Sequence, residues 1–534
     1  MNFTQEINRR RTFAIISHPD AGKTTLTEKL LLYGGAIHLA GSVKARKTAR
    51  HAVSDWMEIE KQRGISVTSS VLQFDYEGHR VNILDTPGHQ DFSEDTYRTL
   101  MAADSAVMLI DVAKGVEAQT EKLFRVCADR GIPIFTFVNK IDHFGRNPYD
   151  LMSELESMLG IRACPMNWPV GINGKYQGIY ERETDTVHVF ERSGDHGQNK
   201  LAVTSGKRTA PEIQALLSED VLAQLEEDIE LLDVAGDPFD AEKIAHGKLT
   251  PLYFGSAMTN FGVQPFLESF LKMAPAPASR RALEETVSPQ SEDFSAFVFK
   301  IQANMDPKHH DRIVFMRICS GQFEKGMSVL HRQSGKTIRL TQPQQFLATE
   351  RTIIESAYPG DIIGVFDPGT MGVGDTLCDP KHVVTFADFP VFPPELFARV
   401  APKDSLKRKQ FLKGMRQLAQ EGAIQIYTQG EGRESFIIGA VGQLQWDVLQ
   451  YRLQNEYNVT VELIPLPYSV ARWALNATPE DLTGLGTSMI VYDNKQRPVI
   501  LLANEWQTNW LTERNPGVTF VASPPIVTVD QEEK

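Results

Sequence analysis

A phosphate-binding loop pattern near the N-terminus limits the possible fold more than any other feature of this sequence. Residues 12–17 are typical of a buried strand, and residues 24–33 are typical of a helix. The segment that joins them closely matches a known phosphate-binding turn and consists of Ser17, His18, Pro19, Asp20, Ala21, Gly22, Lys23 and Thr24. Because such a turn follows a strand and opens a helix, the segment predicts a strand, a loop and a helix in that order.

The residue types of this loop are those that bind phosphate. Gly22 lets the backbone approach the phosphates, Lys23 reaches the β- and γ-phosphates, and the Thr24 hydroxyl ligates Mg²⁺, with Thr25 beside it. The N-terminus of the following helix points its unpaired N–H groups at the same anion. Ser17 stands where the pattern usually has its first glycine. A chance turn is the alternative interpretation of the loop taken alone.

Three further apolar runs of buried-strand type follow at residues 81–84, 106–110 and 134–138. Helical patterns lie between these runs, and this alternation predicts a parallel sheet with helices on both faces. Residues 143–250 differ, because polar segments precede an acidic helical stretch at residues 211–234. We expect this region to be an insertion that is not part of the sheet.

A second polar motif begins where the strand at residues 81–84 ends. It consists of Asp85, Thr86, Pro87, Gly88 and His89. An aspartate at a strand end can hold the water shell of Mg²⁺. Gly88 can donate a backbone N–H to a γ-phosphate and move when that phosphate leaves. Taken alone, the segment is explained equally well as a Pro-Gly turn.

Two later strand ends carry residues suited to a guanine base. The first carries Asn139, Lys140, Ile141 and Asp142. A carboxylate there accepts hydrogen bonds from guanine N1–H and its 2-amino group, neither of which adenine offers. The second, after residues 252–254, carries Ser256 and Ala257, whose backbone could donate to guanine O6. These two motifs are weak alone, but all four motifs lie in order at strand ends, where parallel sheets bind ligands, and together they predict GTP or GDP with Mg²⁺.

Residues 55–66, DWMEIEKQRGIS, and the DTPGH form of the second motif resemble the translational GTPases of the elongation factor G-like group. Residues 441–449 are similar to a helix start in the third domain of that group. The resemblance implies an α/β P-loop GTPase domain with an inserted subdomain, a β-barrel domain and an α+β C-terminal domain. Pro-rich stretches at residues 274–293 and 389–394 mark the boundaries. The expected domains are 1–279 with the insertion at 143–250, 280–388, and 389–534.

The same resemblance implies roles for individual residues. His89 corresponds to the catalytic histidine that positions the attacking water on the ribosome. Thr24 and Ser66 would ligate Mg²⁺ directly, and Asp85 would do so through water. Ser66 replaces the usual switch threonine, so it keeps the hydroxyl but loses β-branched stiffness. Pro19 stands where relatives usually carry Val or Ile, which weakens any hydrophobic gate at this position.

The resemblance also implies a function in translation termination. With 534 residues and only weak signals over 476–534, the chain is too short for the two extra domains of a translocase. We expect a ribosome-dependent GTPase that promotes dissociation of the codon-reading class I release factors after peptide release. One alternative is a translocation-type or ribosome-protecting GTPase. Others are a P-loop phosphotransferase, which would not need Asn139 and Asp142, and a binding switch with negligible hydrolysis, which would not need His89.

Composition limits the partners and the location. A net charge of −13 argues against binding nucleic acid through overall charge, so ribosomal RNA would be met through local basic patches. One candidate patch, equally well explained as a solvated helix face, is Lys403, Lys407, Arg408, Lys409, Lys413 and Arg416. A second is Lys44, Arg46, Lys47 and Arg50. Four dispersed cysteines and the lack of any apolar run near ~20 residues predict a cytoplasmic protein without a membrane segment. We also expect a monomer.

Overall fold

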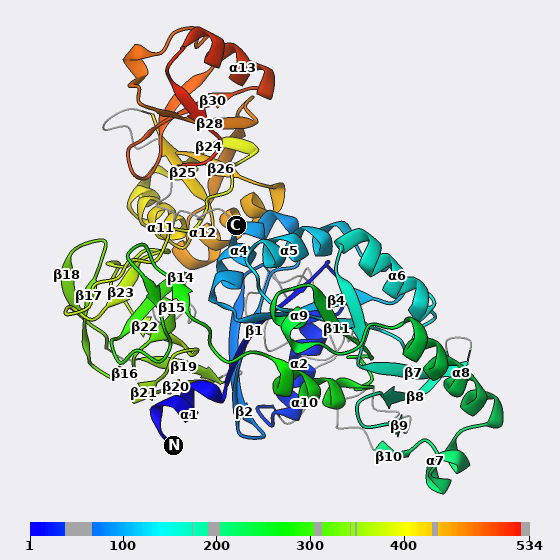
Figure 1. Cartoon of the computed structure of the whole chain (residues 1–534). Helices are drawn as coiled ribbons and strands as arrows, with labels where there is room; N and C mark the ends of the chain where they lie inside the picture. Colours follow the sequence, from blue (N-terminus) through cyan, green and yellow to red (C-terminus); the bar gives the residue numbers. More distant parts are fainter. Residues whose placement is uncertain are drawn as a thin grey trace.

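The computed structural model has three successive parts, and Figure 1 shows the last of them standing above the junction of the first two. We call them the α/β domain, the β domain and the C-terminal domain. The structure describes residues 1–37, 67–172, 175–190, 203–303, 312–341, 343–347, 350–429 and 436–524. Ser66, residues 55–66 and the basic residues at 44–50 lie outside this description.

A seven-stranded sheet in the order β2-β3-β1-β4-β5-β11-β6 forms the centre of the α/β domain. Its strands are β1 (Arg10–Ser17), β2 (Ser70–Tyr76), β3 (His79–Asp85), β4 (Ser105–Asp111), β5 (Ile134–Asn139), β6 (Arg162–Pro165) and β11 (Leu249–Phe254). β2 is antiparallel to β3, and every other neighbouring pair is parallel. The predicted parallel sheet is therefore confirmed.

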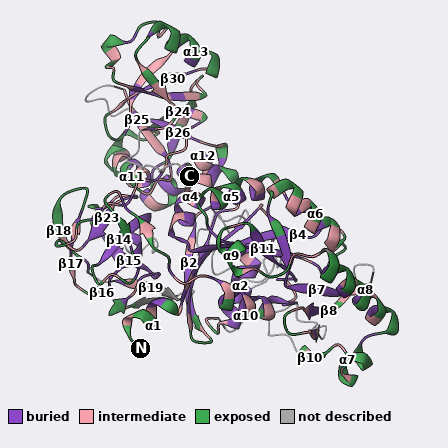
Figure 2. Cartoon of the chain, in the orientation of Figure 1, coloured by how far each residue is buried: buried purple, intermediate pink, exposed green. Residues whose placement is uncertain are grey.

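Helices cover both faces of this sheet, because its strands are apolar on both sides. In β1, Phe13 and Ile15 pack into one core with α2 (Lys23–Tyr33) and α10 (Val263–Met273). Ala14 and Ile16 pack into the opposite core, which three other helices cover on this face. These are α4 (Ser93–Ala102), α5 (Ala118–Asp129) and α6 (Pro148–Leu159). Figure 2 shows the buried residues concentrated along these strands. In the described part of the chain, no helix is both long and apolar enough to cross a membrane.

The region predicted as an insertion outside the sheet differs from that expectation in one respect. Its strand β6 pairs in parallel with β11 and forms the edge of the main sheet, so the prediction that residues 143–250 lie outside the sheet was wrong there. β6 has only four residues, too few to show a periodic pattern. Apart from α6 and the first residues of β11, the other described elements of the region are a separate antiparallel sheet and three helices. These elements are β7 (Asn167–Ile172), β8 (Lys175–Glu181), β9 (Thr186–Phe190), β10 (Val203–Lys207), α7 (Pro211–Leu216), α8 (Glu219–Ala235) and α9 (Ala241–Ala245).

The β domain contains an eight-stranded antiparallel sheet in the order β18-β17-β23-β14-β15-β22-β19-β20. Its strands are β14 (Ser295–Ala303), β15 (Arg312–Ser320), β17 (Ser328–His331), β18 (Lys336–Arg339), β19 (Gln344–Leu347), β20 (Glu350–Ile353), β22 (Ile362–Phe366) and β23 (Thr376–Cys378). Two-stranded pairs accompany it, namely β12 (Arg280–Arg281) with β13 (Thr286–Val287) and β16 (Phe323–Glu324) with β21 (Ser356–Ala357). The sheet closes around its own apolar core as a half-barrel, which confirms the predicted barrel-type fold.

The C-terminal domain is α+β, as predicted, with strand order β27-β24-β26-β25-β29-β30-β28-β31. The strands are β24 (Leu396–Pro402), β25 (Gln425–Thr428), β26 (Phe436–Ala440), β27 (Val461–Pro465), β28 (Val470–Leu475), β29 (Met489–Tyr492), β30 (Pro498–Leu502) and β31 (Thr519–Val521). Its longer helices are α11 (Arg408–Gln420), α12 (Gln443–Tyr457) and α13 (Glu505–Arg514). α11 and α12 pack together against β24 and β26 through one apolar core.

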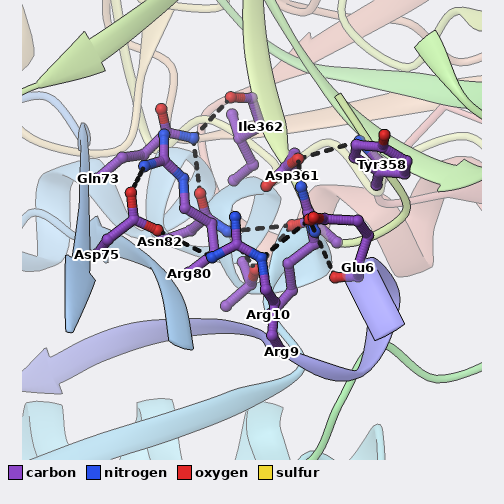
Figure 3. A network of polar contacts seen from close by, with 12 residues as sticks. Glu6, Arg9, Arg10, Gln73, Asp75, Arg80, Asn82, Tyr358, Asp361 and Ile362 are labelled. Carbon is purple, nitrogen blue, oxygen red and sulfur yellow. Dashed lines mark hydrogen bonds and ion pairs between the residues drawn. The ribbon is translucent and has the colours of Figure 1, made fainter. Parts of the chain in front are cut away.

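A buried polar network joins the α/β domain to the β domain (Figure 3). Arg10 at the start of β1 donates from Nε to Asp361 Oδ2 at 2.8 Å, and both side chains are almost fully buried. Arg10 also pairs with Glu6 of α1 (Phe3–Asn8) at 2.7 Å. Gln73 of β2 donates to the carbonyl of Ile362 at 2.9 Å. Because buried charges are costly unless they are paired, these contacts favour one relative placement of the two domains.

Candidate nucleotide site

The predicted motifs meet at one edge of the seven-stranded sheet. Because β1, β3, β5 and β11 are parallel, their carboxyl ends lie at the same edge, and the four motifs follow directly after them. Hydrogen bonds connect the motifs to one another across the sheet. The arrangement is that of a ligand site built on strand ends.

The phosphate-binding loop lies between β1 and α2 and depends on its glycine. Gly22 has φ +100°, a left-handed conformation that disfavours other residues. A Cβ atom there would lie 2.4 Å from Asn139 Nδ2, so no side chain fits. Asp20 is also left-handed, with φ +67°. The loop thus leads straight into the N-terminus of α2, where an anion is favoured by the helix dipole and the unpaired N–H groups.

Asn139, at the end of β5, connects two of the loops. Its Nδ2 donates to the carbonyl of Ala21 at 2.8 Å, and its Oδ1 accepts from the N–H of Ala257 at 2.8 Å. The side chain is fully buried. Asn139 therefore fixes the phosphate-binding loop against the loop that follows β11.

Lys140 makes a second connection, to a residue that the sequence analysis did not identify. Its Nζ donates to the carbonyl of Asp20 at 2.6 Å and pairs with Asp111 Oδ2 at 2.8 Å. Burial raises the pKa of Asp111, but the hydrogen bond from Lys140, the backbone N–H of Ala113 and the nearby lysine charges together outweigh burial and leave that pKa below its usual range. Asp111 ends β4, and a polar residue at the end of a central strand is the signal that could have identified it.

The residues predicted to contact the guanine base follow two neighbouring strands, β5 and β11, at the same edge of the sheet. Ile141 is buried and its N–H donates to the carbonyl of Gly255 at 3.3 Å, while Asp142 keeps 23% of its side chain exposed. The amide of Ser256 donates to the carbonyl of Phe261 at 2.8 Å, and that of Ala257 donates to Asn139. If the amide of Ser256 or Ala257 donates to guanine O6, it must do so with a hydrogen that is already bonded to a protein acceptor.

Lys23 and Asp85 form a buried ion pair at the centre of the site. Lys23 Nζ lies 2.5 Å from Asp85 Oδ1, and the side chains are 7% and 2% exposed. Asp85 Oδ2 is buried and has no hydrogen-bond partner among the described residues. A buried carboxylate oxygen in this condition fits a hydrated Mg²⁺ ion, which binds proteins through one or two carboxylates and substrate phosphates. Thr24 and Thr25 follow Lys23 on α2.

The turn after β3 is held close to the phosphate-binding loop. The Thr86 hydroxyl donates to the carbonyl of Ile15 at 2.7 Å. Pro87 is buried, and a Cβ on Gly88 would lie 3.5 Å from Pro19 Cα. The turn that follows Asp85 therefore lies in van der Waals contact with the loop.

The two histidines of the site are anchored at one end. His89 keeps 36% of its side chain exposed, and its Nδ1 accepts from the N–H of Asp91 at 3.2 Å. The His18 ring lies 3.3 Å from Glu117 through Nε2, and its backbone N–H donates to the hydroxyl of Thr120 at 3.1 Å. The contact of His89 involves Nδ1 and not Nε2, whereas the second ring nitrogen of His18, Nδ1, is buried without a hydrogen-bond partner among the described residues.

Comparison with known proteins identifies the family. Residues 8–276 match the elongation factor Tu GTP binding domain, residues 293–380 match elongation factor G domain 2, and residues 386–512 match the C-terminal domain of the class II release factor RF3. Peptide chain release factor 3 of Symbiobacterium thermophilum is 60% identical over 98% of this chain and 99% of its own length. That of Gloeobacter violaceus is 54% identical over 98% of both chains. The chain belongs to the peptide chain release factor 3 family.

Membership of the peptide chain release factor 3 family makes this chain a translational GTPase with a class II release factor domain. The predicted resemblance to the elongation factor G-like group is therefore confirmed. A crystal structure from Thermus thermophilus matches 88% of this chain and 71% of its own, with a TM-score of 0.68 and 23% identity, and it shares the fold. The GTP-binding domain of the family implies a guanine nucleotide at the site described above.

Proposed function

We propose that this protein hydrolyses GTP on the ribosome in order to release codon-reading class I release factors after the peptide has left. The observation that carries the proposal is the presence, on one chain, of a guanine-nucleotide site and a domain of the class II release factor type. Hydrolysis changes the contacts of the loops that surround the γ-phosphate, and a docked domain converts that change into movement. The protein would act as a cytoplasmic monomer, with domains at 1–279, 280–388 and 389–534.

The nucleotide would be held by the four strand-end motifs. The backbone of the phosphate-binding loop and Lys23 would bind the phosphates, and Asp142 would read the guanine base. Mg²⁺, when bound, neutralises charge that develops on the β- and γ-phosphates. Thr24 would hold it directly and Asp85 through water, with Ser66 as a further ligand. Lys23 would exchange Asp85 for phosphate as its partner when the nucleotide binds.

His89 would position the attacking water. Phosphoryl transfer depends mostly on placement and on charge stabilisation, so no side chain needs to be a strong base. His89 follows the turn that contacts the phosphate-binding loop, and its ring is half exposed. Ribosomal contact would move this ring toward the γ-phosphate.

The exposed basic residues of α11 support a contact with ribosomal RNA. Lys409, Lys413 and Arg416 lie at helical spacing and are exposed, whereas Phe411 and Met415 are buried in the domain core. Three cations on one helix face suit the phosphate backbone. This interpretation and a solvated helix face both fit the described contacts.

A stopped-flow experiment tests the proposal. A labelled class I release factor is bound to ribosomes that have already released their peptide, and its dissociation is followed after addition of the protein with GTP. We expect faster dissociation with GTP than with GDP, and no movement of messenger RNA in a parallel translocation assay. Translocation without release-factor departure would contradict the proposal.

Two variants separate binding from hydrolysis. Lys23→Ala should abolish nucleotide binding, because the phosphates lose their nearest cation. His89→Ala should keep GTP affinity within severalfold but lower ribosome-stimulated hydrolysis by about a hundredfold. An equal loss of affinity and turnover in His89→Ala would show that the residue is structural.

A further inference from the structure

Asp91 contacts both the proposed catalytic histidine and the C-terminal domain. It lies in the short helix η1 (Gln90–Phe92), two residues after His89, and its side chain is 7% exposed. Its backbone N–H donates to His89 Nδ1 at 3.2 Å, and its Oδ1 lies 3.3 Å from the same nitrogen. Its other oxygen, Oδ2, accepts from the N–H of Leu444 at 2.9 Å. A single residue therefore touches His89 and the first turn of α12.

This carboxylate serves as the cap of α12. The N-terminal residues of a helix have N–H groups without an intrahelical acceptor, and a nearby side chain usually supplies one. The N-cap residue of α12 is Gly442, which has no side chain to do so. Asp91 supplies the acceptor from the α/β domain, and it places a negative charge at the positive end of the helix dipole.

Gly442 shows how close this contact is. Its φ of −149° is extended backbone that any residue adopts, so the conformation does not require glycine. A Cβ atom at this position would nevertheless lie 2.1–2.2 Å from the carboxylate atoms of Asp91. The position therefore requires glycine because Asp91 occupies the space that a side chain would fill.

Further contacts hold the same segment on the C-terminal domain. Phe92 packs with Leu444 and Val448 in a small apolar cluster. From α4, Arg98 Nη2 donates to the carbonyl of Gly422, just after the end of α11, at 3.2 Å. A carboxylate thus meets the positive end of one helix while a guanidinium meets the negative end of another. The segment between β3 and β4 is docked on the C-terminal domain at two points of complementary charge.

We propose that Asp91 is a positioning residue for His89, and that docking of α12 on Asp91 sets the orientation of the His89 ring. The inference rests on the proposed catalytic role of His89. Because both the backbone N–H and Oδ1 of Asp91 face Nδ1, the contact fixes that edge of the ring and presents Nε2 away from Asp91. When α12 undocks, Oδ2 of Asp91 loses its hydrogen bond to Leu444, and the contact that orients the His89 ring is weakened. The C-terminal domain thereby controls hydrolysis without touching the nucleotide.

The test perturbs the contact from both sides. Asp91→Ala removes the cap, and Gly442→Ala places a methyl group against the carboxylate. Each should lower kcat for ribosome-stimulated hydrolysis by about tenfold to a hundredfold, since small misplacements of a positioning group have effects of this size. The Kd for GTP should stay within twofold. In the double variant the methyl group has room, so kcat should be no lower than in Asp91→Ala.

Hydrogen exchange of the Leu444 amide separates loss of the cap from general destabilisation, because general destabilisation would not speed exchange at this amide selectively. This amide should exchange faster in Asp91→Ala and regain protection in Asp91→Asn, because asparagine also caps helices. A matched control is Asn504→Ala, which removes the cap of α13 in the same domain, where Asn504 accepts from Gln507, and should leave kcat unchanged.

Four outcomes decide between the explanations. Wild-type kcat in Asp91→Ala, or additive losses in the double variant, would overturn the inference. Unchanged exchange at Leu444 in Asp91→Ala would overturn it as well. Wild-type kcat in His89→Ala would instead refute the catalytic role of His89, and the exchange experiment would still show whether Asp91 caps α12.

Discussion

Replacing Asn139 by alanine tests whether the loops of the nucleotide site must be organised before the ligand arrives. Asn139→Ala removes two hydrogen bonds of 2.8 Å and leaves the carbonyl of Ala21 and the N–H of Ala257 buried without their donor or acceptor. Each such orphaned group costs about 1–3 kcal/mol. The nucleotide would have to order the two loops itself, so about 2–6 kcal/mol of binding energy is lost, or roughly thirtyfold to twenty-thousandfold in Kd.

The assay is titration of a fluorescent guanine nucleotide, with thermal unfolding measured on the same samples. Asn167 provides a matched control, because it is also buried and also makes two hydrogen bonds to backbone, both to Phe254, at 2.7 and 3.1 Å. Asn167→Ala should destabilise the fold to a similar degree but keep Kd within threefold. An Asn139→Ala protein that binds as tightly as wild type, or an equal loss of affinity in Asn167→Ala, would refute the reasoning.

Three other predictions concern the base, an interface and the thiols. Asp142→Asn should weaken GTP binding by about a hundredfold or more, because the variant loses charge-assisted hydrogen bonds worth roughly 1.5–3 kcal/mol each. The same variant should bind xanthosine triphosphate better than the wild type does in competition assays. Asp361→Ala leaves Arg10 without its main buried partner, which costs about 3–5 kcal/mol, so chemical denaturation should begin at lower denaturant with unchanged Kd for GTP. Burial raises the pKa of Cys127 to about 12 and those of Cys164 and Cys319 to about 11, and it also raises that of Cys378. Native protein at pH 8 should therefore react with no thiol reagent until it unfolds. The free energy of unfolding should fall as pH rises above 9.0, the thiol pKa in the unfolded chain, because the unfolded chain then loses thiol protons that the native chain retains.

The sequence predicted those parts of the fold and the site that depend on local residue order. The strands that carry the four motifs were predictable because a buried parallel strand is a short apolar run and its functional residue follows it directly. The phosphate-binding loop was predictable because Gly22 needs a backbone conformation that favours glycine.

Other features depend on partners distant in the sequence and were missed. β6 is a four-residue edge strand that only its pairing with β11 reveals. Residues 489–521 hold three short strands and α13 although their sequence signals are weak, because packing within the sheet supplies the stability that local propensity does not. The contact between Asp91 and Leu444 spans 353 residues, and no local pattern on either side indicates that the two residues meet.

The position of β11 beside β5 has a consequence for how the protein is made. The two strands are neighbours in the sheet, yet the whole of β6 to β10 and α6 to α9 is translated between them. Asn139 cannot meet Ala257 until that intervening chain has been synthesised, and closing so long a loop delays folding. A nascent chain that already displays its complete phosphate-binding loop therefore still lacks Ser256 and Ala257, which we propose contact the base. We expect full nucleotide affinity only once β11 has left the ribosome that makes it and has paired with β5, so the order of synthesis would keep an unfinished chain from acting as a switch.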